Sequence, residues 1–250
     1  MKWRSLQESS PETGSRRLYE IFAERRELIA RYVPAEIQTI HSKAVEELKQ
    51  AGLAEKALKA GDPAPQFELP DQNGKLVRSA ELLASGPLVV CFIRGRWCPF
   101  CVGQMEAMNA IVVELKKLGA SLVGISPQTV HQSFLMADQH KLEFPLLSDQ
   151  GNKVARKFRL VYRVPDYQQD VYRRAFTNLP FMNGDESWEL PIPGTYIVGT
   201  KSAAESRESF PSSEADSKRV AQVLYAYSNP EYTERPEPAD LLIRIAHLTS

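Results

Sequence analysis

The sequence lacks the features that mark secreted and membrane proteins. Its 250 residues include only three cysteines, and an odd, clustered set of that size does not form the disulfide framework of a secreted scaffold. No apolar run approaches the roughly 18 residues that a membrane-spanning helix requires, and the opening stretch MKWRSLQESSPETGSRR contains no apolar segment of an export signal. We therefore expect a cytoplasmic protein with no membrane partner.

Net charge is also lacking. The 31 lysines and arginines balance the 31 aspartates and glutamates, so the chain has no overall field that would attract nucleic acid or an anionic surface. The rest of the composition is ordinary for a globular protein, with 43% hydrophobic and 25% charged residues. Because 250 residues exceed the usual size of about 150 per domain, we expect one domain with an appendage.

Hydrophobic periodicity divides the chain near residue 60. Between Arg17 and Lys59, apolar residues recur at helical spacing, and Pro34 is predicted to separate two helices. This stretch predicts an N-terminal helical extension over residues 1–60. Its apolar face would pack on the main domain or on a second subunit, which leaves a homodimer open.

Residues 61–250 are predicted to form an α/β domain. Apolar runs such as LVVCFI and SLVGIS are typical of strands buried on both faces, and helical segments alternate with them. Such alternation indicates βαβ units and a mainly parallel sheet. The pattern weakens between Val161 and Leu190, where we expect an irregular cover over one sheet edge, and the polar segment 201–218 is expected to be a surface insertion.

The stretch RGRWCPFC, residues 94–101, follows one of these buried strands. Proline is favoured at the first position of a helix, so Pro99 predicts Cys98 as the N-cap and Cys101 as the third helical residue. A thiolate at an N-cap can accept hydrogen bonds from the free backbone N–H groups and is stabilised by the helix dipole. We therefore expect Cys98 to be the more exposed and more acidic thiol, with Arg94 and Arg96 either adding positive potential or pointing into solvent.

Two thiols one helical turn apart can close a disulfide, which predicts that Cys98 attacks and Cys101 resolves. A CxxC pair can also bind zinc, but zinc needs about four ligands, and the chain has no second CxxC and only four scattered histidines. Neither a metal nor another cofactor is therefore expected. Cys91, inside the strand, is predicted to be a small core residue.

Several motifs resemble a known family. FIRGRWCPFC is similar to a thioredoxin-fold active site, and GDPAPQFELPDQNGK, GISPQT and LEFPLLSDQGNKVARKFRL resemble peroxiredoxins of the AhpC/TSA type. With NGDESWELPIPGTYIV and NPEYTERPEPADLL, they resemble peroxiredoxin-like redoxins that carry CxxC. The resemblance covers about residues 30–248 and is interrupted at 201–218.

The resemblance implies a thioredoxin-like fold, with a central mixed sheet flanked by helices. It also implies a thiol oxidoreductase that acts on a peroxide or disulfide substrate and is recharged by thioredoxin or a similar reductant, with no bound cofactor. Matching to thioredoxins places the attacking thiol at Cys98, whereas matching to peroxiredoxins places it at Cys101. Trp97 and Pro99 are supporting residues of the motif, and Pro193 matches the cis-proline of thioredoxin folds.

The sequence also departs from both patterns. Arg94 stands where peroxiredoxins have a proline, and Phe92 stands where thioredoxins have a buried acid. Three readings follow: a thiol peroxidase, a thiol-disulfide oxidoreductase without peroxidase activity, or a redox sensor whose disulfide state changes a partner-binding surface. We favour the peroxidase, and a zinc-binding structural module is a distant fourth alternative.

Overall fold

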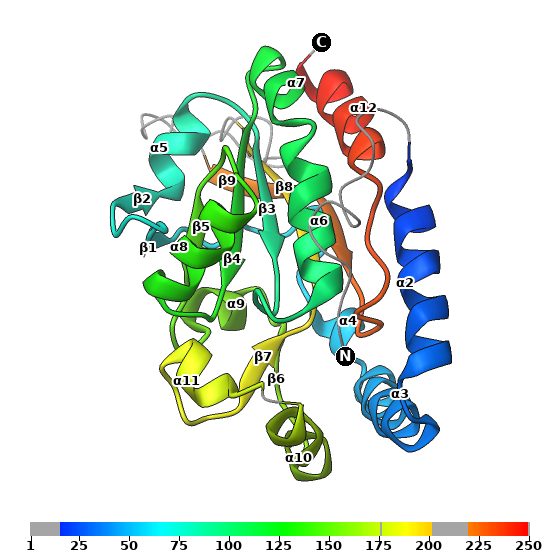
Figure 1. The fold of residues 1–250 in the computed structure, drawn as a ribbon. Coiled ribbons are helices and arrows are strands. Elements are labelled where there is room, and N and C mark those ends of the chain that lie inside the picture. Colours follow the sequence, from blue (N-terminus) through cyan, green and yellow to red (C-terminus); the bar gives the residue numbers. More distant parts are fainter. Residues whose placement is uncertain (1–15, 176, 202–219, 250) are drawn as a thin grey trace.

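A five-stranded mixed sheet forms the centre of the chain, in a computed structural model that describes residues 16–175, 177–201 and 220–249 (Figure 1). The strand order is β5-β4-β3-β8-β9, in which β3, β4 and β5 are parallel and β8 and β9 are antiparallel. The strands are β1 Glu68–Pro70, β2 Leu76–Arg78, β3 Leu88–Phe92, β4 Ser121–Ser126, β5 Leu146–Ser148, β6 Val161–Arg163, β7 Glu189–Pro191, β8 Gly194–Lys201 and β9 Val220–Ser228. The mixed sheet that the resemblance implies is confirmed, and its parallel half is the part in which strands and helices alternate along the sequence.

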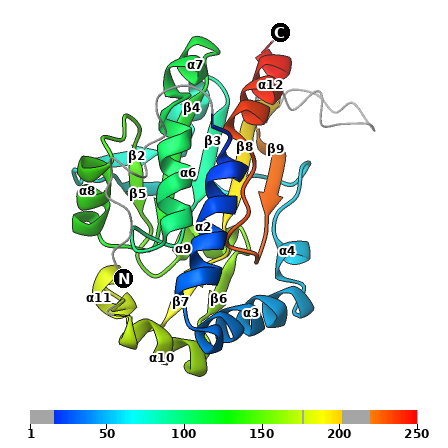
Figure 2. The ribbon, with the colours of Figure 1, turned by 45° about the vertical axis from the view of Figure 1, so that its right-hand side comes forward.

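Helices cover both faces of this sheet (Figures 1 and 2). They are α2 Leu18–Tyr32, α3 Ala35–Gln50, α4 Leu53–Lys56, α5 Ser79–Ala84, α6 Pro99–Asn109, α7 Val112–Lys117, α8 Val130–Gln139, α9 Lys153–Lys157, α10 Asp166–Arg174, α11 Leu179–Asn183 and α12 Pro238–Thr249. No helix in the described ranges is both long and apolar enough to cross a membrane.

Strand β3 is apolar throughout because it contributes to two cores. Val89 and Cys91 point to the core that contains α6, whereas Val90 and Phe92 point to the core on the opposite face. Alternation of side chains along a strand produces this division, and all five residues of β3 are buried. Because β3 is fixed on both sides, the loop at its carboxyl end starts from a rigid position.

The N-terminal helices α2 and α3 pack on the rest of the chain. Pro34 lies between them, as predicted, with extended backbone angles that end one helix before the next begins. Leu18 and Phe22 of α2 are buried in the same core as α6, and α2 lies along α6 (Figure 2). Helix α3 contacts α10, where Gln168 bonds to the ring of His41 across 2.9 Å.

The prediction of an irregular cover between Val161 and Leu190 is wrong. This segment contains β6, α10, α11 and β7, and strands β6 and β7 pair as a small antiparallel sheet. It has a small core of its own, formed by Val164, Tyr172, Leu179, Trp188 and Leu190. Half of the buried residues of α10 are glutamines, Gln168 and Gln169, so its inward face carries little of the apolar periodicity that predicts a helix. The predicted insertion at 201–218 lies, beyond Lys201, outside the described residues.

Candidate thiol site

The cysteine pair lies where β3 passes into α6, as the sequence predicts. Cys98 is the N-cap of α6 with extended backbone angles, and Pro99 is the first helical residue. Gly95 permits the turn before the helix because its φ of 142° is one that side-chain-bearing residues rarely adopt. The backbone N–H of Cys98 donates to the Gly95 carbonyl across 3.2 Å, which fixes the entry into the helix. Cys98 and Cys101 therefore share one helical turn.

All three cysteines are free thiols, and Arg94 contacts both members of the pair. Its Nη2 donates to Cys98 Sγ across 3.2 Å, and its backbone N–H donates to Cys101 Sγ across 3.4 Å. The expectation that the Cys98 sulfur accepts a bond from the first helical turn is wrong, since Cys98 makes no side-chain cap bond. Instead, the Cys98 sulfur accepts its hydrogen bond from the guanidinium of Arg94, in the loop before the helix. This donor carries a full positive charge.

The expectation that Cys98 is exposed is also wrong. The side chains of Cys98 and Cys101 are 0% exposed, and Arg94 is 4% exposed. The Arg94 guanidinium lies 4.9 Å from the ring centre of Trp97 and 4.0 Å from that of Tyr232. The two aromatic rings thus lie around the guanidinium that donates to the Cys98 sulfur. The thiols are thus buried against a charged group and not in hydrocarbon alone.

The surroundings of the two thiols push their pKa values in opposite directions. Burial raises the pKa of Cys98, but the hydrogen bond from the Cys101 thiol and the charges of Arg94 and Arg235 together hold it well below its ordinary value of 9.0. Burial and the proton shared with Cys98 raise the pKa of Cys101 well above that value. Cys98 is therefore the first thiol of the pair to lose its proton, and Cys101 is the one that keeps it.

The Cys98 sulfur is the main group that offsets the burial of the Arg94 charge. Burial alone would lower the pKa of Arg94, but interaction with Cys98, then with Tyr172, Tyr162 and Cys101, raises it well above its ordinary value. None of these four groups is a carboxylate. The buried guanidinium and the Cys98 thiolate are therefore each other's main counter-ion.

Sequence reasoning missed Arg235, which reaches the pair from the segment before α12. Its Nη2 lies 3.7 Å from Cys101 Sγ, and its Nε donates to Gln104 Oε1 across 2.7 Å. Gln104 in turn donates to Thr195 Oγ1 of β8 across 3.1 Å. Arg235 is separated from Cys101 by 134 residues, and the only signal in the sequence is a single arginine in the acidic segment YTERPEPAD.

The enclosing tyrosines were missed as well. Tyr172 of α10 packs against Trp97 with ring centres 5.2 Å apart, and Tyr232 packs against Phe100 at 5.8 Å. Burial raises the pKa of Tyr232 to about 12, so its phenol stays protonated. His41 of α3 lies between these two tyrosines, and burial followed by the charge of Arg94 lowers its pKa to about 4.

Two of the predicted site residues have other surroundings. The backbone N–H of Arg96 donates to Gln128, just before α8, and its guanidinium donates to Gln132 within α8, so its described bonds do not reach the thiols. Pro193 is preceded by a trans peptide bond, which corrects the expected cis-proline. The Pro193 carbonyl accepts from the backbone of Asn229 across 3.2 Å.

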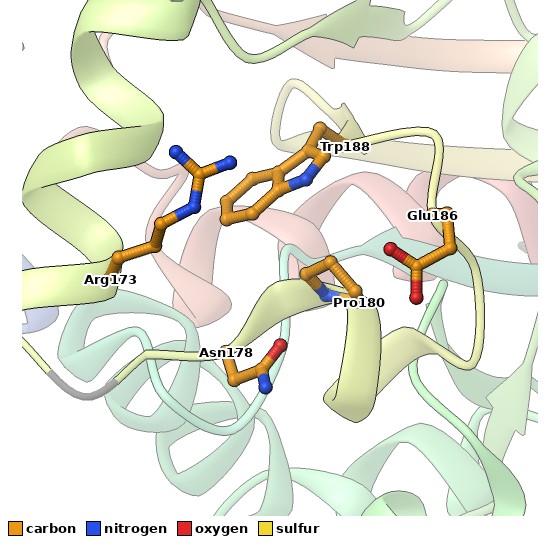
Figure 3. A pocket seen from close by; sticks show the side chains of 5 residues that line it. All are labelled: Arg173, Asn178, Pro180, Glu186 and Trp188. Atoms are coloured by element: carbon orange, nitrogen blue, oxygen red, sulfur yellow. The ribbon is translucent and has the colours of Figure 1, made fainter.

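A hollow lies on the 161–190 segment, with a volume of about 580 Å³ (Figure 3). In it the Arg173 guanidinium stacks on the Trp188 ring at 4.7 Å, and the lining is completed by Asn178, Pro180 and Glu186. No residue of the thiol site lines this hollow. Among the described residues, no cluster of three or more His, Cys, Asp or Glu side chains is arranged to hold a metal ion.

The fold and the CxxC pair at the start of α6 define a thioredoxin-like α/β protein. Residues 60–203 match the AhpC/TSA family, which is more than half of the chain, so the chain belongs to that family. Relatives of known name include Peroxiredoxin Bcp of Escherichia coli, 36% identical over 101 residues, or 40% of this chain and 64% of that protein. The chloroplastic Peroxiredoxin Q of Gentiana triflora is 37% identical over 98 residues, 39% of this chain and 45% of that protein. The matched part thus spans less than two thirds of either relative.

Solved structures agree on the fold. Peroxidoxin BcpB from Mycobacterium tuberculosis superposes with a TM-score of 0.53 at 23% identity, covering 76% of this chain and 97% of that one. A mutant of peroxiredoxin 6 from Arenicola marina superposes with a TM-score of 0.54 at 15% identity, covering 76% of this chain and 73% of that one. The thioredoxin-like fold expected from the sequence is thereby confirmed.

Proposed function

We propose that this protein is a thiol-dependent peroxidase that works through a dithiol/disulfide cycle of Cys98 and Cys101. One observation carries the proposal: the buried Cys98 sulfur lies 3.2 Å from the Arg94 guanidinium and one helical turn from the Cys101 thiol, in surroundings that hold its pKa well below the ordinary value. A thiolate is the form of cysteine that attacks a peroxide, and a nearby resolving thiol is the arrangement that the cycle requires.

The proposed reaction has three steps. The Cys98 thiolate attacks one peroxide oxygen, the O–O bond breaks, and an alcohol or water leaves after taking up a proton. The sulfur is oxidised to a sulfenic acid. Cys101 then attacks the Cys98 sulfur, forming the disulfide and releasing water, after its thiol proton has passed to the departing hydroxyl. An external dithiol reduces the disulfide and restores both thiols.

The buried polar atoms around Cys98 support a small polar substrate. Arg94 Nε, Trp97 Nε1 and the Tyr172 hydroxyl are buried and have no hydrogen-bond partner among the described residues. Burying a polar group costs free energy unless the group has a hydrogen-bond partner. The oxygens of a peroxide are suitable acceptors for these donors. Arg94 and Trp97 are therefore proposed as substrate-positioning groups.

The burial of Cys98 in the reduced protein favours a small peroxide over a protein disulfide as the first substrate. Reduction of the resulting disulfide by a thioredoxin-like protein then requires the site to open. The alternative, a thiol-disulfide oxidoreductase without peroxidase activity, predicts rapid reduction of insulin disulfides and no consumption of peroxide. Comparing both rates for the wild-type protein separates the two functions.

Turnover with hydrogen peroxide, thioredoxin, thioredoxin reductase and NADPH tests the proposal. The wild-type protein should consume peroxide with multiple turnovers. Cys101→Ser should consume about one equivalent and stop, because no resolving thiol remains, whereas Cys98→Ser should consume none. The proposal would be overturned if the wild-type protein consumed no peroxide. It would also be overturned if Cys98→Ser and Cys101→Ser both consumed peroxide as the active wild-type protein does.

The partner and location are part of the same proposal. A thioredoxin-like dithiol is the proposed reductant, and replacing it with glutathione and glutaredoxin in the same assay distinguishes the two donors. The reducing chemistry and the low cysteine content support a cytoplasmic location. A homodimer, which the sequence leaves open, is tested by the mass measured in analytical ultracentrifugation.

A further inference from the structure

The N-terminal helix α2 contacts the first turn of the CxxC helix directly. The Arg25 guanidinium of α2 donates from Nη1 to the carbonyl oxygen of Pro99, the residue between the two cysteines that begins α6. Three residues earlier, the Phe22 ring meets the Phe100 ring edge-on, with centres 5.1 Å apart. Two consecutive residues of the motif, Pro99 and Phe100, are therefore held by side chains of α2.

Gly103, one turn further along α6, permits this close approach. A Cβ at this position would lie 2.9 Å from the Phe22 ring and nearer still to the Arg25 guanidinium, closer than such atoms approach in proteins. Any larger residue at 103 would push Arg25 or Phe22 away from α6. The sequence thus has its smallest side chain where the two helices meet most closely.

The contact continues beyond the motif. Arg25 Nη2 lies 4.0 Å from Glu106 Oε2, and the other oxygen of Glu106 bonds to His140 Nδ1 at 2.9 Å. Arg25 is thereby held between the Pro99 carbonyl and a carboxylate on the same helix. Burial lowers the pKa of Arg25, while Glu106 and then Cys98 raise it, so the thiolate is within electrostatic reach of α2.

We propose that α2 is part of the thiol site and that Arg25 is a positioning residue, which holds the first turn of α6 and with it the Cys98–Cys101 pair. The AhpC/TSA match begins at residue 60, whereas α2 ends at Tyr32, so this element lies outside the part of the chain that matches the family. The inference deepens the proposed peroxidase function and rests on it for reaction rates, but the state of the thiols can be measured without any peroxide.

The test is a pH titration of thiolate absorbance in the reduced protein, made beside a thermal melt of each variant. Arg25→Ala should raise the pKa of Cys98 by about half a pH unit or more, because it removes a positive charge and a fixed donor near the thiolate. Arg25→Lys should recover part of this change, since it restores the charge without the planar fork. Arg16→Ala is the matched control, because Arg16 pairs with Glu24 at the surface.

Gly103→Ala tests the same contact from the opposite helix and leaves Arg25 in the chain. Alanine is the better helix former, so a contact of no consequence predicts an unchanged or stabilised protein with an unchanged Cys98 pKa. The proposal instead predicts a raised Cys98 pKa, as in Arg25→Ala. If both variants keep the wild-type pKa, the proposal is wrong, whether or not the protein reduces peroxide. If Arg25→Ala does not fold, Gly103→Ala and Arg25→Lys still decide.

Discussion

The Arg94 guanidinium and the Cys98 sulfur form a buried ion pair, with Nη2 and Sγ 3.2 Å apart and Arg94 4% exposed. Two aromatic rings, those of Trp97 and Tyr232, enclose the cation. Because both groups are buried, the interaction between their charges is only weakly screened.

Replacing Arg94 should remove a large part of the stabilisation of the thiolate, to which the hydrogen bond from Cys101 also contributes. In Arg94→Gln the Cys98 pKa should rise by one unit or more, because an opposite charge in contact typically shifts a pKa by about one to three units. Once the pKa exceeds the assay pH, the rate with peroxide should fall roughly tenfold for each further unit, since only the thiolate reacts. Stopped-flow kinetics with thiolate titration measure both quantities. A variant with the wild-type pKa and rate would show that Arg94 has no such role.

Oxidation should destabilise the fold. Forming the disulfide consumes the thiolate and leaves Arg94 buried without its counter-ion, and an uncompensated buried charge costs about 3 to 5 kcal/mol. A disulfide that closes so short a loop stabilises the folded state by only about 2 kcal/mol. The oxidised protein should therefore melt several degrees below the reduced one.

Arg94→Met is the control for the comparison of oxidised and reduced melting temperatures. It removes the buried positive charge that oxidation would leave without a counter-ion. In this variant the disulfide form should melt at or above the temperature of the reduced form. An oxidised wild-type protein more stable than the reduced one would contradict the account.

The stability of the reduced protein should depend on pH through Cys98. Its folded pKa lies well below the unfolded value of 9.0, so the stabilisation from the thiolate is complete above about pH 9 and is lost as the pH falls through the folded pKa. Cys98→Ser lacks this contribution. The difference in unfolding free energy between wild type and Cys98→Ser, measured by urea denaturation, should shrink as the pH falls over this window. A difference that is constant with pH would argue against a low folded pKa.

Cys91 should be dispensable for chemistry. It is buried in β3, and burial raises its pKa to about 12, so it stays protonated and unreactive at neutral pH. Cys91→Ala should keep the wild-type rate with peroxide and lose about 1 kcal/mol of stability from the small cavity. The peroxidase assay and a urea melt check both expectations, and a loss of turnover would make Cys91 a third redox thiol.

Patterns of neighbouring residues in the sequence correctly predict the strand and the helix that hold the cysteine pair. Pro99 sets the start of α6 and hence Cys98 as its N-cap, and the apolar run before it gives the doubly buried strand β3. Both predictions depend on neighbouring residues alone.

The surroundings of the sulfur are set by long-range contacts, which the sequence does not predict. Tyr172 comes from α10, and Tyr232 and Arg235 come from the segment before α12, so their side chains meet the motif only after the chain has folded. Their contribution reverses one expectation, because they bury a thiol that the N-cap position alone would expose. The lowered Cys98 pKa is expected from the sequence, but its source is guanidinium charge and a thiol hydrogen bond, not backbone amides.

The central claim, that Cys98 is the thiol that reacts with peroxide, is tested most directly by trapping its sulfenic acid. Cys101→Ser and Cys98→Ser are each treated with one equivalent of hydrogen peroxide and a 1,3-dicarbonyl probe, and the labelled residue is located by mass spectrometry. The account predicts a label on residue 98 in Cys101→Ser and no label on Cys101 in Cys98→Ser. A label on Cys101 at the wild-type rate, with Cys98 unmodified in the other variant, would contradict it.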